Sequence, residues 1–249
     1  MADTNHAINL IFAISNILAQ IFIWYAFYVF SDILRIIDHN HKTKTGRELL
    51  LIVLPLLLIQ PVISGYFFYE TEAFPPPDMS LFIFAVFFIA HLLILITILH
   101  FKNKMDLPIK HKNIIYAYIL LYFTINMYAV LGLTAYNLIP QFLYLAGKLF
   151  LAVSLLIIFE YTAHTFKELA VISRLFFISA LLIFTTPLLR VYALYNANSQ
   201  EIMIFARAIN LTVNLAVGII MLIGMLVFRN LIINFYAIKD GLAKKKKYI

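Results

Sequence analysis

Seven long apolar segments, separated by short polar joints, constrain the fold of this chain more than any other feature. A membrane-spanning helix needs about 20 consecutive apolar residues, and each segment reaches that length. Backbone polar groups inside lipid must bond within their own segment, which favours helices, and the alternation typical of barrel strands is not visible. The sequence predicts an all-α integral membrane protein, a seven-transmembrane-helix bundle with spans at 8–30, 49–69, 81–101, 114–136, 142–163, 170–192 and 202–228.

The composition excludes several classes of soluble protein. Of the 249 residues, 63% are hydrophobic and 12% are charged, whereas a soluble domain has about 25% charged residues. A soluble enzyme, a disordered chain and a nucleic-acid binder are therefore excluded for the bulk of the chain, despite its net charge of +7. The chain has no cysteine, so a disulfide, a thiolate metal site and a cysteine nucleophile are excluded as well.

The basic residues predict the orientation of the bundle. Sixteen of the 19 lysines and arginines lie in, or beside, the joints at 31–48, 102–113 and 164–169 and in the tail. The opposite joints, at 70–80, 137–141 and 196–201, contain none. The positive-inside rule then places the N-terminus outside and the C-terminus in the cytosol. We expect one membrane domain over 1–228 and a basic cytosolic tail over 229–249.

The tail ends in a run of basic residues, Lys244 to Lys247. These lysines favour anionic lipid headgroups, at about 1 kcal/mol for each basic residue near the surface, or they act only as a further determinant of topology. The tail either continues the last span as a helix or lies along the inner interface. The final residues, Lys246-Lys247-Tyr248-Ile249, resemble the dilysine retrieval signal of endoplasmic-reticulum membrane proteins. This signal applies to a eukaryotic source, and the alternative location is the inner membrane of a cell.

Two spans share a pattern that indicates an internal repeat. Pro61, Tyr66 and Tyr69 have the same spacing as Pro187, Tyr192 and Tyr195. Two units of three helices joined by a linker helix would account for it. This 3+1+3 plan resembles the architecture of SWEET and PQ-loop transporters and of microbial rhodopsins. The likeness concerns architecture alone and carries no function, because the motifs of these families are not matched.

Polar residues in the outer half of the spans suggest a ligand site. Lys148, Arg190 and Arg207 are basic residues inside spans, and such residues mark functional sites by default. Together with nearby phenols they would hold an anionic or polar ligand; the alternative is that their long side chains reach the outer headgroups. Paired prolines inside helices also point to a central site. The candidate ligand-binding residues are Lys148, Arg190, Arg207, Asn210, Asn214, Tyr66, Tyr192, Gln60, Pro61 and Pro187.

A second group, Glu160, His164, His100 and His91, would carry a proton or hold a cation. The alternative for Glu160 and His164 is a packing hydrogen bond near the cytosolic interface. His91 is the one histidine deep in a span, so a bis-histidine haem within one subunit is disfavoured. Whether any histidine binds a metal is left open by the sequence, as is the cofactor.

These features favour a multi-pass membrane protein that binds a small polar or anionic ligand between its helices, for transport or sensing. One alternative is a non-catalytic membrane subunit of a larger complex, with a membrane protein or a second copy of the chain as its partner. A histidine- and metal-dependent lipid-modifying enzyme is the less favoured alternative, because no motif of such an enzyme is present. We expect the lipid bilayer to be the main partner of the chain, and we expect no nucleic-acid partner.

Overall fold

The computed structural model describes residues 2–37, 44–71, 76–104, 112–131, 138–165, 170–195 and 200–246. Within these ranges the chain forms helices and no strand, which confirms the all-α prediction. The helices are α1 (Ala2–Ile37), α2 (Lys44–Thr71), α3 (Pro77–Lys104), α4 (Lys112–Leu131), α5 (Leu138–Thr165), α6 (Ala170–Tyr195) and α7 (Gln200–Lys246). Each contains one of the seven apolar segments or most of it.

Six of the helices described here are long and apolar enough to cross a membrane. They are α1, α2, α3, α5, α6 and α7, which supports an integral, multi-pass membrane protein. Helix α4 contains most of the span predicted at 114–136, but it ends at Leu131 and is not among the six. Large apolar side chains cover the outside of the bundle, among them Leu120, Val171 and Phe205. A surface of this kind suits contact with lipid.

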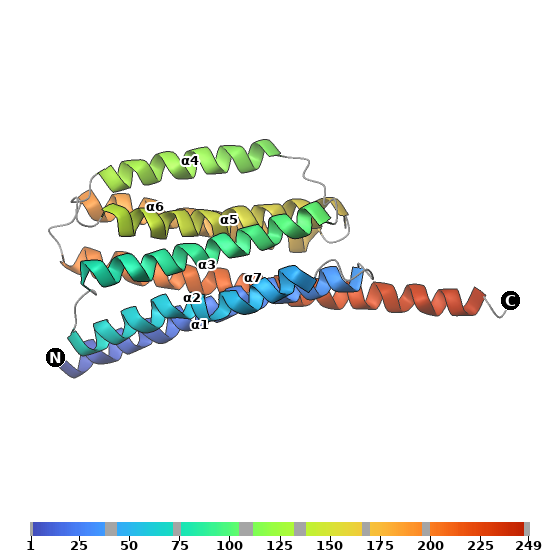
Figure 1. Cartoon of the computed structure of the whole chain (residues 1–249), viewed down its shortest axis with the longest axis horizontal. Helices are drawn as coiled ribbons and strands as arrows, with labels where there is room; N and C mark the ends of the chain where they lie inside the picture. Colours follow the sequence, from blue (N-terminus) through green and yellow to red (C-terminus); the bar gives the residue numbers. More distant parts are fainter. Residues whose placement is uncertain are drawn as a thin grey trace.

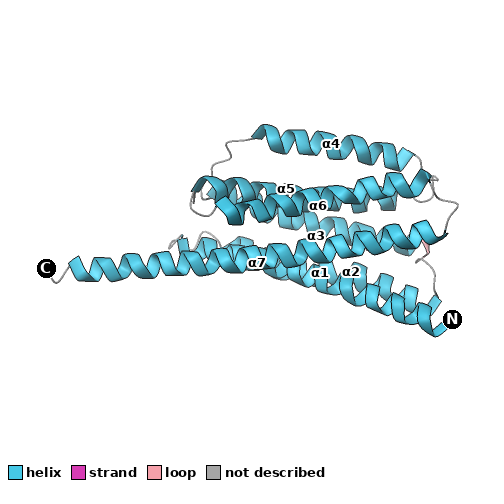
Figure 2. Cartoon of the chain, turned by 180° about the vertical axis from the view of Figure 1, so that it is seen from behind, coloured by secondary structure: helices cyan, strands magenta, loops and turns pink. Residues whose placement is uncertain are grey.

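The six long helices form a closed ring. Helix α1 packs on α2, α2 on α3, α3 on α5, α5 on α6, α6 on α7, and α7 returns to α1 with the most extensive contact of all. Helix α4 lies outside this ring and packs on α5 and α6, so it stands at one edge of the bundle in both views (Figures 1 and 2). The orientation in the membrane and the internal repeat stay predictions, because the arrangement of the helices tests neither.

Helix α5 is the most buried of the six, with 67% of its apolar segment inside the bundle against 28–44% for the other five. It is covered by α3, α6 and α4. Two tyrosines of α4 donate hydrogen bonds to backbone carbonyls of the ring. The Tyr118 hydroxyl lies 2.7 Å from Ala180 O in α6, and the Tyr122 hydroxyl 3.2 Å from Leu145 O in α5. Helix α4 is therefore attached to the ring by polar as well as apolar contacts.

Glycines let several helices approach closely, and two of these contacts involve α7 and α5. A Cβ atom on Gly218 of α7 would lie 3.0 Å from Ala19 O and 3.1 Å from Phe22 Cβ, both in α1. A Cβ atom on Gly147 of α5 would lie 3.0 Å from two ring atoms of Phe87 in α3. The second approach brings the Phe87 ring directly onto α5, next to Lys148.

Helix α7 is continuous from Gln200 to Lys246. Of the two forms predicted for the tail after residue 228, the structure therefore has the continued helix. Figure 1 shows the C-terminal part of α7, in red, extending well past the ends of the other helices. The ring thus carries a long helical projection at the end of the bundle that the sequence assigns to the cytosol.

Candidate functional site

The side chain of Lys148 lies at the centre of the ring. It is 1% exposed, and its position ten residues after Leu138 puts it about 15 Å along α5. The ammonium Nζ donates a hydrogen bond to Asn214 Oδ1 in α7 over 2.7 Å. It also lies 5.6 Å from the ring centroid of Phe87 and 5.7 Å from that of Tyr144, within the range of cation–π attraction. Three helices therefore hold this cation.

A second bond of the same kind lies one helical turn away. Asn210 Nδ2 of α7 donates to the Tyr144 hydroxyl of α5 over 3.2 Å. Because residues four apart share a helix face, Tyr144 and Lys148 point to the same side of α5, and Asn210 and Asn214 to the same side of α7. The two bonds join helices that are not neighbours in the order of the ring. They therefore cross its interior.

Helix α6 contributes Thr186 to this group. The Thr186 hydroxyl donates to Asn210 Oδ1 over 3.2 Å. Thr186 immediately precedes the buried Pro187 in the chain. A proline inside a helix cannot donate to the carbonyl one turn earlier, which for Pro187 is that of Ile183. Thr186 therefore places a polar group of α6 directly before this proline.

His91 of α3 completes the group. Its ring lies against Phe87, with the ring centroids 4.1 Å apart, and Nδ1 lies 2.9 Å from Phe87 O. A carbonyl oxygen only accepts, so Nδ1 carries a proton, while Nε2 accepts in the neutral ring and donates in the imidazolium. Nε2 is buried and has no hydrogen-bond partner among the described residues. Lys148 and His91 therefore both lie beside the Phe87 ring.

We call the six residues His91, Tyr144, Lys148, Thr186, Asn210 and Asn214 the polar centre. It contains a cation, an imidazole, two amides, a phenol and a hydroxyl, and the Lys148, His91, Thr186 and Asn214 side chains are buried. Such a set can donate hydrogen bonds to an anion and accept or release a proton at His91. Of the candidate residues from the sequence, the structure brings together His91, Lys148, Asn210 and Asn214, beside Pro187.

Other candidate residues lie elsewhere. Gln60 is buried next to the buried Pro61, and its Oε1 accepts a hydrogen bond from Asn16 Nδ2 over 3.3 Å. This pair joins α1 to α2 and stands apart from the polar centre. Tyr66 and Tyr192 are 63% and 48% exposed, on the outside of the bundle.

The remaining candidates are near the ends of their helices or outside the described side chains. Glu160 is buried in α5, twelve residues or about 18 Å beyond Lys148. His100 is half-buried near the end of α3, and its ring lies 6.3 Å from that of Phe101. Arg190, Arg207 and His164 belong to α6, α7 and α5, but their side chains are not among those described. Over the described ranges no group of three histidines or carboxylates has a metal-binding arrangement.

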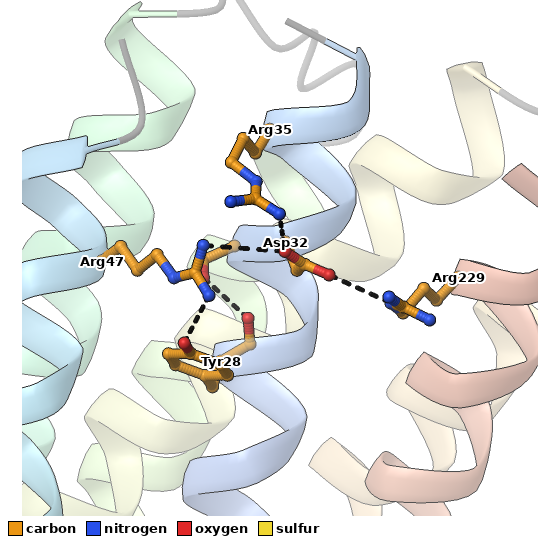
Figure 3. A network of polar contacts seen from close by, with 6 residues as sticks. Tyr28, Asp32, Arg35, Arg47 and Arg229 are labelled. Atoms are coloured by element: carbon orange, nitrogen blue, oxygen red, sulfur yellow. Dashed lines mark hydrogen bonds and ion pairs between the residues drawn. The ribbon is translucent and has the colours of Figure 1, made fainter. Parts of the chain in front are cut away.

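A second polar cluster was missed by the sequence reasoning, which treated its arginines only as determinants of topology. Asp32 of α1 forms ion pairs with Arg35 of the same helix, Arg47 of α2 and Arg229 of α7 (Figure 3). We call these four residues the arginine cluster. The signal available in the sequence was an acidic residue, Asp32, within a joint that contains four basic residues.

The comparisons with other proteins name no relative for this chain. No protein-family model matches the sequence, and no curated protein or solved structure is similar to it. The polar centre and the arginine cluster are therefore interpreted from their own geometry and chemistry.

Proposed function

We propose that this chain is a seven-span membrane protein whose polar centre binds a small anion between the helices, for transport or sensing. In this proposal α4 completes the set of spans, the N-terminus is outside and the C-terminus is cytosolic. The observation that carries it is the buried side chain of Lys148, in one group with His91, whose buried Nε2 has no hydrogen-bond partner within the described part of the chain and would donate to the anion once protonated.

The physical reason is the free energy that it costs to bury the ammonium of Lys148. Moving an ammonium from water into a protein interior costs several kcal/mol, and a bundle held together by packing alone does not need one. Neutral partners such as Asn214 and the rings of Phe87 and Tyr144 offset part of this cost. An anion that reached Lys148 would offset more, since opposite charges attract strongly where the dielectric constant is low.

The polar centre is also built from the helices on several sides of the ring. Its residues come from α3, α5, α6 and α7, so a ligand bound there would contact four helices at once. If these helices can adopt two arrangements, a ligand that binds one of them more tightly would increase the population of that arrangement. Transport and sensing both need such a coupling between binding and helix position.

The test is the effect of defined anions on the purified chain. Sodium chloride, acetate, phosphate and sulfate are compared at constant ionic strength, and the midpoint of thermal unfolding is measured. We expect one of these anions to raise the midpoint of the wild type and of a control, Lys112→Met, but not of Lys148→Met. Lys112 begins α4 and is exposed, so the control removes the same charge outside the polar centre. Equal responses of both variants, or no response to any anion, would contradict the proposal.

Reconstitution then separates transport from sensing. The anion that stabilises the wild type is loaded into liposomes containing the chain, and its release is followed. Release that Lys148→Met abolishes and Lys112→Met preserves indicates transport. Binding without release indicates sensing.

The second candidate function is that of a non-catalytic subunit in a larger membrane complex. The projection of α7 past the other helices favours it, since a long helix outside the bundle offers a surface to a partner (Figure 1). This candidate predicts that a partner co-purifies in a fixed ratio from the native membrane in mild detergent. A chain that purifies alone favours the anion-binding proposal.

A further inference from the structure

The arginine cluster concentrates positive charge at one point on the bundle. Arg35 Nη2 lies 2.9 Å from Asp32 Oδ1, Arg229 Nε lies 3.0 Å from Asp32 Oδ2, and Arg47 Nη1 lies 3.7 Å from Asp32 Oδ1. Figure 3 shows the three guanidinium groups around this one carboxylate, reached from α1, α2 and α7. The four residues carry a net charge of +2. Arginine does not lose its proton in proteins, so this excess persists at every physiological pH.

The open side of the cluster is formed by its arginines. The Asp32 side chain is 14% exposed, whereas those of Arg35, Arg229 and Arg47 are 54%, 37% and 27% exposed. The carboxylate is therefore the least exposed part of the cluster, and the arginine side chains form its accessible surface. Arg47 is held in place by the Tyr28 hydroxyl, which accepts a hydrogen bond from Nη2, and by the Tyr28 ring, 4.6 Å from its guanidinium carbon.

The surroundings of the cluster are those of a membrane interface. Trp24, Tyr25 and Tyr28 occupy the preceding two turns of α1, and the Trp24 and Tyr28 rings are stacked with centroids 5.4 Å apart. Trp24 Nε1 donates to Leu50 O of α2 over 2.6 Å. Tryptophan and tyrosine are enriched at the level of the lipid headgroups, where one end of the side chain is apolar and the other polar.

Apolar side chains on the outside of the bundle flank the cluster. Leu226 and Ile233, about one turn before and one turn after Arg229 in α7, are exposed, and so is Leu51, one turn after Arg47 in α2. A site of this kind combines guanidinium groups with a surface suited to acyl chains. A lipid with a charged headgroup presents the same combination in a single molecule.

We propose that the arginine cluster binds the phosphate group of an anionic lipid, with the acyl chains lying along the exposed apolar residues of α2 and α7. Guanidinium groups bind phosphate oxygens through pairs of parallel hydrogen bonds. The bound phosphate compensates the charge left over after Asp32 is paired. Because the cluster joins α1, α2 and α7, the lipid also connects these three helices at the end of the bundle where α7 projects. This proposal is independent of the polar centre.

The test measures lipid retention by the full-length chain. The protein is purified in mild detergent, exchanged into nanodiscs of phosphatidylcholine with or without phosphatidylglycerol, and examined by native mass spectrometry for bound lipid. We expect the wild type to retain phosphatidylglycerol over phosphatidylcholine by about 30-fold, from two excess charges at about fivefold for each. High salt screens the attraction of an exposed lysine tail, so the comparison is made at high salt.

Variants of opposite charge make the test specific. Arg35→Gln/Arg229→Gln removes the excess charge, and we expect its lipid preference to disappear. Asp32→Asn increases the positive charge of the cluster, and we expect the preference to rise even though the helices lose an ion-pair partner. If the arginines served only to bind Asp32, neither variant would change lipid retention, and the proposal would be wrong.

Two matched controls exclude other sources of the effect. Arg174→Gln removes an exposed arginine of α6 outside the cluster, and replacement of Lys244, Lys245, Lys246 and Lys247 by glutamine removes the basic end of the tail. Both should keep the wild-type preference. Loss of the preference in the tail variant alone would assign lipid binding to the tail and overturn the proposal.

The source of the phosphate is tested separately. Inorganic phosphate is added to the wild type in phosphatidylcholine nanodiscs that contain phosphatidylglycerol. Retention of phosphatidylglycerol in its presence supports the lipid site. Complete displacement by millimolar phosphate would show that the cluster binds the free anion and would overturn the assignment to lipid.

Discussion

The ammonium of Lys148 in α5 donates a 2.7 Å hydrogen bond to the side-chain oxygen of Asn214 in α7. One turn away, the Asn210 amide donates to the Tyr144 hydroxyl of the same helix, α5. The two bonds cross the interior of a six-helix ring and connect helices that are not ring neighbours. We therefore expect the free energy of unfolding of the bundle to depend on these few buried polar groups, and substitutions at them can measure that dependence.

The first prediction concerns the Lys148–Asn214 pair. A hydrogen bond to a charged group contributes about 1.5–3 kcal/mol, so Asn214→Leu, which leaves the ammonium without this acceptor, should lower the free energy of unfolding by at least that amount. Lys148→Met should cost less, because apolar replacement of a buried charge is often tolerated. Reversible unfolding in mixed detergent micelles measures both values.

The double variant provides the control for this pair. Once Lys148 is methionine, replacing Asn214 removes no charged bond, so Lys148→Met/Asn214→Leu should be nearly as stable as Lys148→Met. If the two single effects simply added, the bond would contribute nothing to stability, and its place at the centre of the structure would need another explanation.

The second prediction concerns the close approach of α7 to α1. Gly218→Ala puts a Cβ atom 3.0 Å from the backbone oxygen of Ala19, which cannot move without shifting α1. Overpacking of this kind costs about 1–3 kcal/mol, and we expect a lower midpoint of thermal unfolding. Gly224→Ala is the matched control in the same helix, because its nearest atoms are flexible side-chain ends of Phe176 and Leu175 at 3.3–3.4 Å. An equal loss of stability in both variants would argue against a backbone contact at Gly218.

The third prediction concerns the attachment of α4. Tyr118→Phe removes the hydrogen bond to Ala180 O and leaves that buried carbonyl without this donor. The expected cost is about 1 kcal/mol, and it should appear as faster hydrogen exchange in α4 than in the ring helices. Tyr116→Phe, at an exposed site in the same helix, should leave the exchange rates unchanged. Uniformly faster exchange across all helices would instead indicate that α4 is part of one cooperative unit with the ring.

The fourth prediction concerns orientation, and the absence of cysteine makes it easy to test. A cysteine introduced at Ala73 lies in a joint without basic residues, and one introduced at Lys110 lies in a basic joint. If the N-terminus is outside, a membrane-impermeant maleimide added to intact cells should label the first and not the second. Permeabilised cells should allow both to react. The opposite pattern would reverse the predicted topology.

That the chain is helical, and where most of its helices lie, follows from the sequence alone. Every helix in the described residues contains a predicted segment or most of it. The reason is that an apolar segment of this length can form all its backbone hydrogen bonds within lipid by folding as a helix. Lys148 and Asn214 were recognisable for the same reason, since a polar residue within such a run is costly and stands out.

The tertiary structure decided which of these residues meet. The spacing of Tyr144 and Lys148 matches that of Asn210 and Asn214 on another helix, but their pairing depends on how the ring brings together α5 and α7, the two helices that flank α6. The same holds for Asp32 and Arg229, which are 197 residues apart in the chain. Tyr66 and Tyr192 were expected at the ligand site with Lys148, but the rotation of their helices places them on the outside of the bundle. Helix periodicity gives which residues share a face, whereas the direction of that face is set by packing between helices that the local sequence does not encode.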